Sequence, residues 1–200
     1  MDDHRDFPHI ETDRLLLRPW READREPWAA MNADPSVMEF FPSVLSREQS
    51  DALLDRLNSH IARHGFGFWA LENRANGEFL GFTGLVHTVF AAPFTPCVEV
   101  GWRLARHCWG KGYATEAAWA SLDHGFHRLG LASIVSFAVF ANMRSRRVME
   151  RIGMTHDPGG DFNHPNIPAD HPLQPHVLYR ITAAEHAQKN QMRSVEETRS

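Results

Sequence analysis

The stretch His107-Cys-Trp-Gly-Lys-Gly-Tyr-Ala-Thr-Glu-Ala117 places a glycine-rich turn directly before a predicted helix. Gly110 and Gly112 let the backbone come close to a ligand, because glycine adopts conformations that other residues avoid. Free N–H groups and the positive end of the helix dipole can hold a phosphate there, and Lys111 adds positive charge. The stretch matches neither a P-loop nor the three-glycine dinucleotide fingerprint. Taken alone, these glycines fit an ordinary turn without a ligand equally well.

Strands and helices are predicted on both sides of this turn from the spacing of apolar residues. Before it, Cys97–Leu104 has the alternation of a strand, and Gly101 within it favours a bulge or a splay. After it, one apolar stripe predicts a helix that Gly130 ends, and Ser133–Val139 is typical of a strand. Asn142 is then placed to cap a further helix.

Further from the turn, the chain alternates between shorter predicted elements. Thr12–Arg18 predicts a first strand, and a helix is predicted between a cap at Ser46 and an end at Gly65. Asn76-Gly77 predicts a tight turn between two strands. Residues 157–175 hold five of the 12 prolines without periodicity, so we expect a loop there.

The composition is that of a globular chain with one core. The 200 residues, of which 42% are apolar and 23% charged, suit a single domain. We expect that domain over residues 1–184, and a frayed or disordered tail over residues 185–200, which hold almost no large apolar residue. The two cysteines, Cys97 and Cys108, make no disulfide framework.

Charge, hydropathy and histidine spacing limit the kinds of partner that are expected. The net charge is −4 and no long basic run is present, so a nucleic-acid partner is not expected. No stretch has the pattern of a signal peptide, and no apolar run reaches the ~18 residues of a membrane span. A cytoplasmic location without membrane contact is the default expectation. No metal is expected either, because the spacing of His156, His164, His171 and His176 matches no standard zinc pattern.

Several motifs together resemble one known family. They are Gly110–Ala117, Glu99-Val-Gly-Trp-Arg-Leu104 before it, Asn142-Met-Arg-Ser145 and Met149–Met154 after it, and the opening Glu11–Arg18. In these motifs the chain, from about residue 10 to about residue 182, resembles the RimJ/RimL-like branch of the GNAT superfamily of acetyl-CoA-dependent N-acetyltransferases. The resemblance implies an α+β fold. Its sheet would be mixed, mostly antiparallel and splayed near its centre, with helices on both faces.

The resemblance also implies acetyl-CoA as co-substrate and no metal. The pyrophosphate loop of the family corresponds to His107, Gly110 and Gly112, with histidine standing where the family has Gln or Arg. The strand around Gly101 would pair with the amide-rich pantetheine arm as an added strand does. By resemblance, the residues expected to contact acetyl-CoA are Val98, Val100, Gly101, Trp102, His107, Gly110, Lys111, Gly112, Tyr113, Ala114, Thr115, Asn142 and Ser145.

Two residues are expected to be catalytic. Glu99 occupies the position where many members carry a carboxylate and would take the proton from the attacking amine, although a solvated or ion-paired carboxylate is the other reading. Many members have a tyrosine that protonates the leaving thiolate, and the matching position here is Met149, which cannot donate a proton. Ser145 or water would take that role. Asn142 would contact the cofactor or simply cap its helix.

The function implied is transfer of an acetyl group from the thioester to a primary amine, either a protein N-terminus or a small molecule. The alternative is a catalytically silent module that binds acyl-CoA as a sensor or a partner. Loops at residues 39–43 and 161–165 would shape the acceptor side. The sequence leaves the acceptor open, and it leaves both a monomer and a homodimer open, with Phe90 and Phe94 as an exposed apolar edge that favours the dimer.

Overall fold

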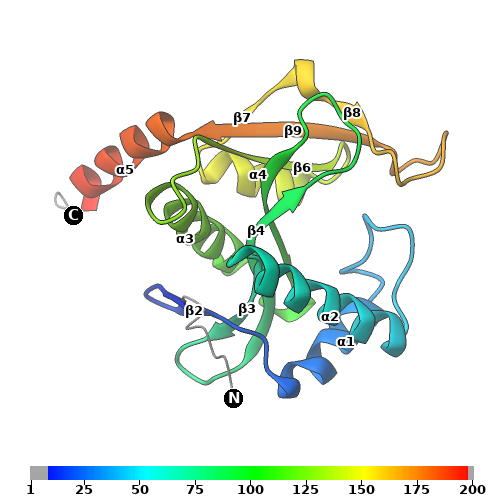
Figure 1. The fold of residues 1–200 in the computed structure, drawn as a ribbon. Helices are drawn as coiled ribbons and strands as arrows, with labels where there is room; N and C mark the ends of the chain where they lie inside the picture. Colours follow the sequence, from blue (N-terminus) through cyan, green and yellow to red (C-terminus); the bar gives the residue numbers. More distant parts are fainter. Residues whose placement is uncertain (1–8, 198–200) are drawn as a thin grey trace. The chain divides into compact units, whose positions relative to one another are not determined.

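The computed structural model describes residues 9–197, with side chains up to residue 193, and is drawn in Figure 1. The described residues form two compact units: unit 1 holds residues 9–86 and 100–121, and unit 2 holds residues 87–99 and 122–197. The division runs through two strands and one helix, so these three elements contribute to both units. The expectation of one domain over residues 1–184 stays a prediction, and residues 1–8 and 198–200 lie outside the described part.

The strands of unit 1 follow one another along the sheet in sequence order. They are β1 (Ile10–Glu11), β2 (Leu15–Arg18), β3 (Phe68–Asn73), β4 (Phe79–Thr88) and β5 (Cys97–Leu104), the last two continuing into unit 2. The pairs β1–β2, β2–β3 and β3–β4 are antiparallel. The predicted turn at Asn76-Gly77 is present, with Gly77 at a φ of 73° between β3 and β4.

Two helices cover a core of aromatic and aliphatic side chains in unit 1. They are α1 (Arg25–Ala33), which follows a 3₁₀ turn at Glu22–Asp24, and α2 (Arg47–His64). Trp28 of α1 is fully buried, and its ring lies 5.7 Å from the ring of Phe82 on β4. The ends of α2 are those that the sequence predicts, with a capping box at Ser46 and a left-handed Gly65.

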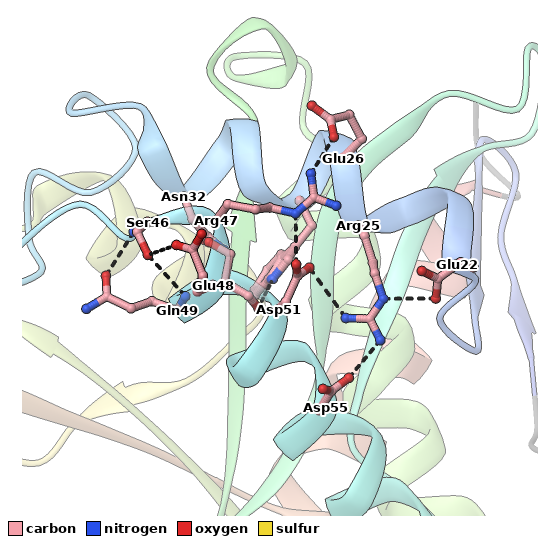
Figure 2. Close-up of polar contacts among 12 residues, drawn as sticks. Glu22, Arg25, Glu26, Asn32, Ser46, Arg47, Glu48, Gln49, Asp51 and Asp55 are labelled. Carbon is pink, nitrogen blue, oxygen red and sulfur yellow. Dashed lines mark hydrogen bonds and ion pairs between the residues drawn. The ribbon is translucent and has the colours of Figure 1, made fainter.

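Ion pairs fix α1 against α2. Figure 2 shows the guanidinium of Arg25 between Glu22, Asp51 and Asp55, with its Nη2 2.7 Å from the Asp55 carboxylate. Arg47 bridges back to Glu26 and to Asp51 in the same view. This network joins the two helices that flank residues 34–46.

The sheet of unit 2 is built around a long central strand. β9 (Pro175–Thr182) pairs antiparallel with β6 (Ser133–Val139), β7 (Thr155–His156) and β8 (Phe162–Asn163). β5 pairs with β6 in parallel, with Glu99 opposite Val135. The expectation of an α+β fold with a mixed, mostly antiparallel sheet is therefore confirmed, while the splay near its centre stays a prediction. The helices of this unit are α4 (Met143–Arg151), α5 (Ala183–Glu197) and the second half of α3 (Tyr113–His127).

The expectation of a frayed tail from residue 185 is wrong for the described residues, because α5 runs to Glu197 (Figure 1). His186 on α5 is fully buried, and its Nε2 lies 2.7 Å from a carboxylate oxygen of Asp123. Its ring also lies 5.0 Å from that of Phe126. The polar composition of residues 185–200 therefore does not reveal this helix, whose contacts with unit 2 include the buried His186. No helix among residues 9–197 is long and apolar enough to cross a membrane.

Candidate active site

The glycine turn of unit 1 ends in an open helix N-terminus. Gly110 and Gly112 both have a left-handed backbone, with φ of 77° and 80°, a conformation that glycine adopts more readily than other residues. The first helical hydrogen bond of α3 runs from the Glu116 N–H to the Gly112 carbonyl at 3.1 Å. Within the described chain, the N–H groups of residues 113–115 have no acceptor. Three donors at the positive end of the helix dipole form a ready anion site.

Arg14 clamps this turn from the opening strand region, a role that the sequence analysis missed. Its Nε donates to Glu116 Oε2 at 2.6 Å, and its Nη1 donates to the Lys111 carbonyl at 2.9 Å. The guanidinium also lies 4.8 Å from the ring centroid of Tyr113. One side chain thus holds the turn, the first residue of the helix and a carboxylate of its first turn. The only signal in the sequence is that Arg14 belongs to the opening motif Glu11–Arg18.

Glu116 is held from a second side as well. The Thr12 hydroxyl donates to Glu116 Oε1 at 2.6 Å. Burial raises the pKa of Glu116, but the hydrogen bonds from Thr12 and Arg14 outweigh burial, so its pKa lies below the ordinary value. An ionised carboxylate in the first turn of α3 keeps Arg14 in place.

His107 is paired with a carboxylate, and the two cysteines have low reactivity. His107 Nε2 lies 2.7 Å from Glu78 Oε1, and this contact is the main cause of the lowered pKa of Glu78. The ring is therefore bound to a carboxylate within unit 1. Burial raises the pKa of Cys97 and of Cys108 to about 11, so neither thiol is an activated nucleophile.

Glu99 in unit 2 has the environment of a base. It is partly buried, and the Thr88 hydroxyl donates to its Oε2 at 3.1 Å. Desolvation raises its pKa to about 8, against the opposing effect of the Thr88 hydrogen bond. A carboxylate with a pKa near the working pH is suited to general base catalysis. Thr88 is a neighbour that the sequence did not single out.

The start of α4 supplies the other two predicted residues of unit 2. Asn142 Oδ1 accepts a hydrogen bond from the Ser145 N–H at 3.1 Å, so Asn142 is the N-cap of α4. Among the residues described, the Ser145 hydroxyl has no hydrogen-bond partner and can serve a ligand. Met149, where the family pattern has tyrosine, is fully buried. The side chain that replaces the tyrosine belongs to the core.

An aromatic cluster lies on the Glu99 face of unit 2. Phe137 follows Val135 by two residues on β6, so both side chains leave the same face of the sheet on which Glu99 pairs with Val135. The rings that surround Phe137 within about 6 Å belong to Phe90, Phe94, Phe162, His164 and His176. Burial lowers the pKa of His164 and of His176, so both rings are neutral near pH 7. These side chains form an aromatic floor on the same face of the sheet as Glu99.

This cluster corrects the expectation of an exposed edge. Phe90 and Phe94 are partly buried, with rings 6.2 Å apart, and each also contacts the ring of Phe162. Their apolar surface is thus covered from within unit 2, and the argument for a dimer from these two residues no longer holds. The loop at residues 161–165 contributes Phe162 and His164, on the face where the sequence analysis expects the acceptor.

The remaining predicted cofactor residues lie on β5. Val98 of unit 2 and Val100 of unit 1 are buried, and Trp102 of unit 1 is partly buried. The Gly101 carbonyl accepts a hydrogen bond from the Thr83 hydroxyl at 3.1 Å. Their expected contacts with the pantetheine arm stay predictions. Across the described chain, no three His, Cys, Asp or Glu residues are grouped so that they could hold a metal ion.

Comparison with known proteins points to one family. A family profile for an acetyltransferase (GNAT) domain of the RimJ/RimL type matches residues 14–155. The FsC-acetyl coenzyme A-N(2)-transacetylase of Aspergillus fumigatus is 32% identical over 185 residues, which are 89% of this chain and 77% of that protein.

Solved structures agree in fold. The acetyltransferase from Agrobacterium tumefaciens strain C58 has a TM-score of 0.71 and 30% identity, and the match covers 87% of this chain and 94% of that one. RimJ from Mycobacterium smegmatis, solved in complex with CoA-disulfide, has a TM-score of 0.68 and 24% identity over 86% of this chain and 83% of its own.

Proposed function

The chain belongs to the GNAT acetyltransferase family, in the RimJ/RimL-type group, and from this premise we propose that it moves the acetyl group of acetyl-CoA to a primary amine by direct attack. The observation that carries the proposal is the open N-terminus of α3 behind two left-handed glycines. The Aspergillus fumigatus relative, by its name an acetyl coenzyme A transacetylase, supports the choice of acyl donor.

The turn fits the pyrophosphate of acetyl-CoA. Its three free N–H groups can donate to phosphate oxygens, and no side chain at Gly110 or Gly112 blocks a close approach. Lys111 is exposed beside the turn and adds a positive charge. Arg14 acts as a positioning residue, because it ties the Lys111 carbonyl and Glu116 to one guanidinium. On β5, the main chain from Val98 to Trp102 would hydrogen-bond the pantetheine amides.

The chemical step needs only a base and a proton for the leaving group. The amine nitrogen attacks the thioester carbonyl carbon and forms the C–N bond, while the Glu99 carboxylate takes the proton that the nitrogen loses. The tetrahedral intermediate then collapses with cleavage of the C–S bond. The CoA thiolate receives a proton from Ser145 or from water. Glu99, with a pKa of about 8, can hold the proton and release it to solvent near neutral pH.

The aromatic cluster supports an acceptor with apolar surface next to its amine. Phe137 and Phe162 are partly buried on the same side of the sheet as Glu99, and the neutral His164 adds no charge that would repel an ammonium group. Such a floor holds the carbon skeleton of an acceptor while the carboxylate faces the nitrogen.

A thiol-release assay with acetyl-CoA and a panel of amines tests this function. The panel contains N-terminal peptides, amino acids, polyamines and aromatic amines. We expect CoA release that depends on at least one amine and produces an N-acetyl product by mass spectrometry. Binding of acetyl-CoA without product across the panel would favour the silent acyl-CoA sensor instead.

A further inference from the structure

Arg103 on β5 is a desolvated cation that the transfer step does not use. Its pKa falls to about 10 because of burial, so the guanidinium is still charged near pH 7. Its Nε is buried and has no hydrogen-bond partner in the structure. None of the described carboxylates forms an ion pair with it. The one hydrogen bond that it makes runs from Nη1 to Asn32 Oδ1 on α1, at 2.6 Å.

Arg18 in the same unit shows how this fold stabilises a buried arginine. It is 4% exposed, and its guanidinium donates to Asp24 at 2.7 Å and to Glu72 at 2.6 Å. A buried charge normally has such partners, because desolvation costs more than an unpaired charge can recover. Arg103 lacks them.

Aromatic rings and one amide surround the guanidinium of Arg103. Cζ of Arg103 lies 4.0 Å from the centroid of the Phe41 ring. The ring centroids of Trp28 and Phe82 are further away, at 5.9 and 5.6 Å. Asn32, which is fully buried and also bound to Ser50, fixes Nη1. In the described part of the protein, Nε, which is buried, and Nη2 have no hydrogen-bond partner, and this edge of a guanidinium matches the two oxygens of a planar carboxylate.

We propose that Arg103, held by Asn32 and stacked on Phe41, is a carboxylate-binding residue that selects the acceptor. This proposal rests on the proposed function, which makes the acceptor a primary amine, so the acceptor is an amine that also carries a carboxylate. Phe41 belongs to the segment at residues 39–43, for which the sequence predicts a role on the acceptor side. The phosphates of the acyl donor have their own donors at the start of α3.

Matched acceptors that carry either a carboxylate or its neutral amide test the proposal, with kcat/KM expressed per unprotonated amine because a nearby carboxylate raises the pKa of the amine. One pair is phenylalanine and phenylalaninamide, which offers an α-carboxylate. A second pair is the dipeptide amides Ala-Glu-NH₂ and Ala-Gln-NH₂, which offers a side-chain carboxylate. In one of the two pairs, we expect kcat/KM for the acceptor with the carboxylate to be about 10- to 100-fold higher than for its amide counterpart. The reason is that the amide cannot accept charge-assisted hydrogen bonds between a carboxylate and arginine. The pair that shows the preference identifies the source of the carboxylate.

Variants assign that preference to Arg103. Arg103→Met removes the charge and should abolish the preference through KM, with the Kd for acetyl-CoA unchanged, and Arg103→Lys should restore part of it. Arg106→Met makes the same change at an exposed arginine near the end of β5 and should keep the preference. The proposal is overturned if the wild type does not distinguish the members of either pair, or if Arg103→Met lowers stability but leaves the preference intact.

A binding measurement keeps the test independent of catalysis. Calorimetry with N-acetylphenylalanine and its amide, and with the N-acetylated dipeptide amides, reports carboxylate binding even in a protein that transfers no acetyl group. Tighter binding of a carboxylate ligand that is lost in Arg103→Met supports the subsite when the proposed function fails. Equal binding of acid and amide in both pairs contradicts it.

Discussion

A single carboxylate, Glu99, sets the expected pH dependence. Burial raises its pKa to about 8, and only the Thr88 hydroxyl donates to it in the described part of the protein. Because a base must be ionised to accept a proton, kcat/KM should rise with pH up to about 8. Folding and titration are also linked. The folded state binds the Glu99 proton more tightly than the unfolded chain does, so Glu99 lowers stability as pH rises from about 4.5 to about 8.

Glu99→Gln should remove both effects. We expect kcat to fall by about 100-fold or more and the rise with pH near 8 to disappear, while the Kd for acetyl-CoA stays the same. Urea unfolding at pH 5 and pH 8.5 should show the variant gaining stability relative to the wild type at the higher pH only. Thr88→Val is the companion variant, since it keeps the carboxylate and should move the profile to higher pH. A Glu99→Gln profile that still rises near pH 8 removes Glu99 from the base role.

At the scale of elements, the anion site depends on how the start of α3 is held. Arg14 joins the turn to the helix through Lys111 and Glu116, so the geometry of the free N–H groups depends on a residue about 100 positions away in sequence. A helix N-terminus binds an anion well only when its donors are fixed beforehand.

Arg14→Ala should therefore weaken acetyl-CoA binding by about 10-fold, which corresponds to about 1.4 kcal/mol. Arg47→Ala is the control, since Arg47 pairs with Glu26 on α1 and with Asp51 on α2 and not with any residue of the clamp. Calorimetric titration of both variants measures the difference. Equal Kd values for the two variants would show that the turn needs no clamp.

Strand and helix positions could be predicted because they depend on local patterns. Cys97–Leu104 and Ser133–Val139 are strands with the predicted bounds, and Asn142 and Gly65 are the caps that the sequence indicates. Alternation, glycine conformation and capping act over a few residues, so one sequence contains them.

The contacts that complete the candidate site could not be predicted in the same way. The pairing of Arg14 with Glu116, and of Arg103 with Asn32 rather than a carboxylate, joins residues that only the folded backbone brings together. Phe90 and Phe94 gave the wrong expectation for the same reason, because a run of apolar residues does not reveal which loop will cover them. The family pattern identifies Glu99, but its raised pKa results from burial in the folded protein.

At the scale of the whole molecule, the C-terminal helix is part of the fold of unit 2. α5 follows β9 directly, and it is anchored by the fully buried His186, which pairs with Asp123 of α3. Asn190, one turn further along, donates to the same carboxylate at 2.9 Å.

His186→Ala should lower the free energy of unfolding by about 1–3 kcal/mol, because a buried hydrogen bond to a charged group and a ring contact with Phe126 are lost. His127→Ala is the control, because the exposed His127 also contacts the Asp123 carboxylate, at 3.6 Å. It should change the free energy of unfolding by less than about 0.5 kcal/mol. Urea denaturation of the two variants gives the comparison. A loss of stability in His186→Ala that is no larger than in His127→Ala would contradict this role of His186.

The most direct test of the account is calorimetric titration of the wild-type protein and of Gly112→Ala with acetyl-CoA. An alanine at residue 112 would be forced to a φ of 80° and would place its methyl group 3.4 Å from Nη2 of Arg14, the side chain that clamps the turn. We predict one binding site per chain in the wild type and a loss of affinity of 10-fold or more in the variant, with both proteins equally folded by circular dichroism. The absence of binding heat in the wild type, or equal affinity in the two proteins, would contradict the assignment of the α3 N-terminus as the acetyl-CoA site.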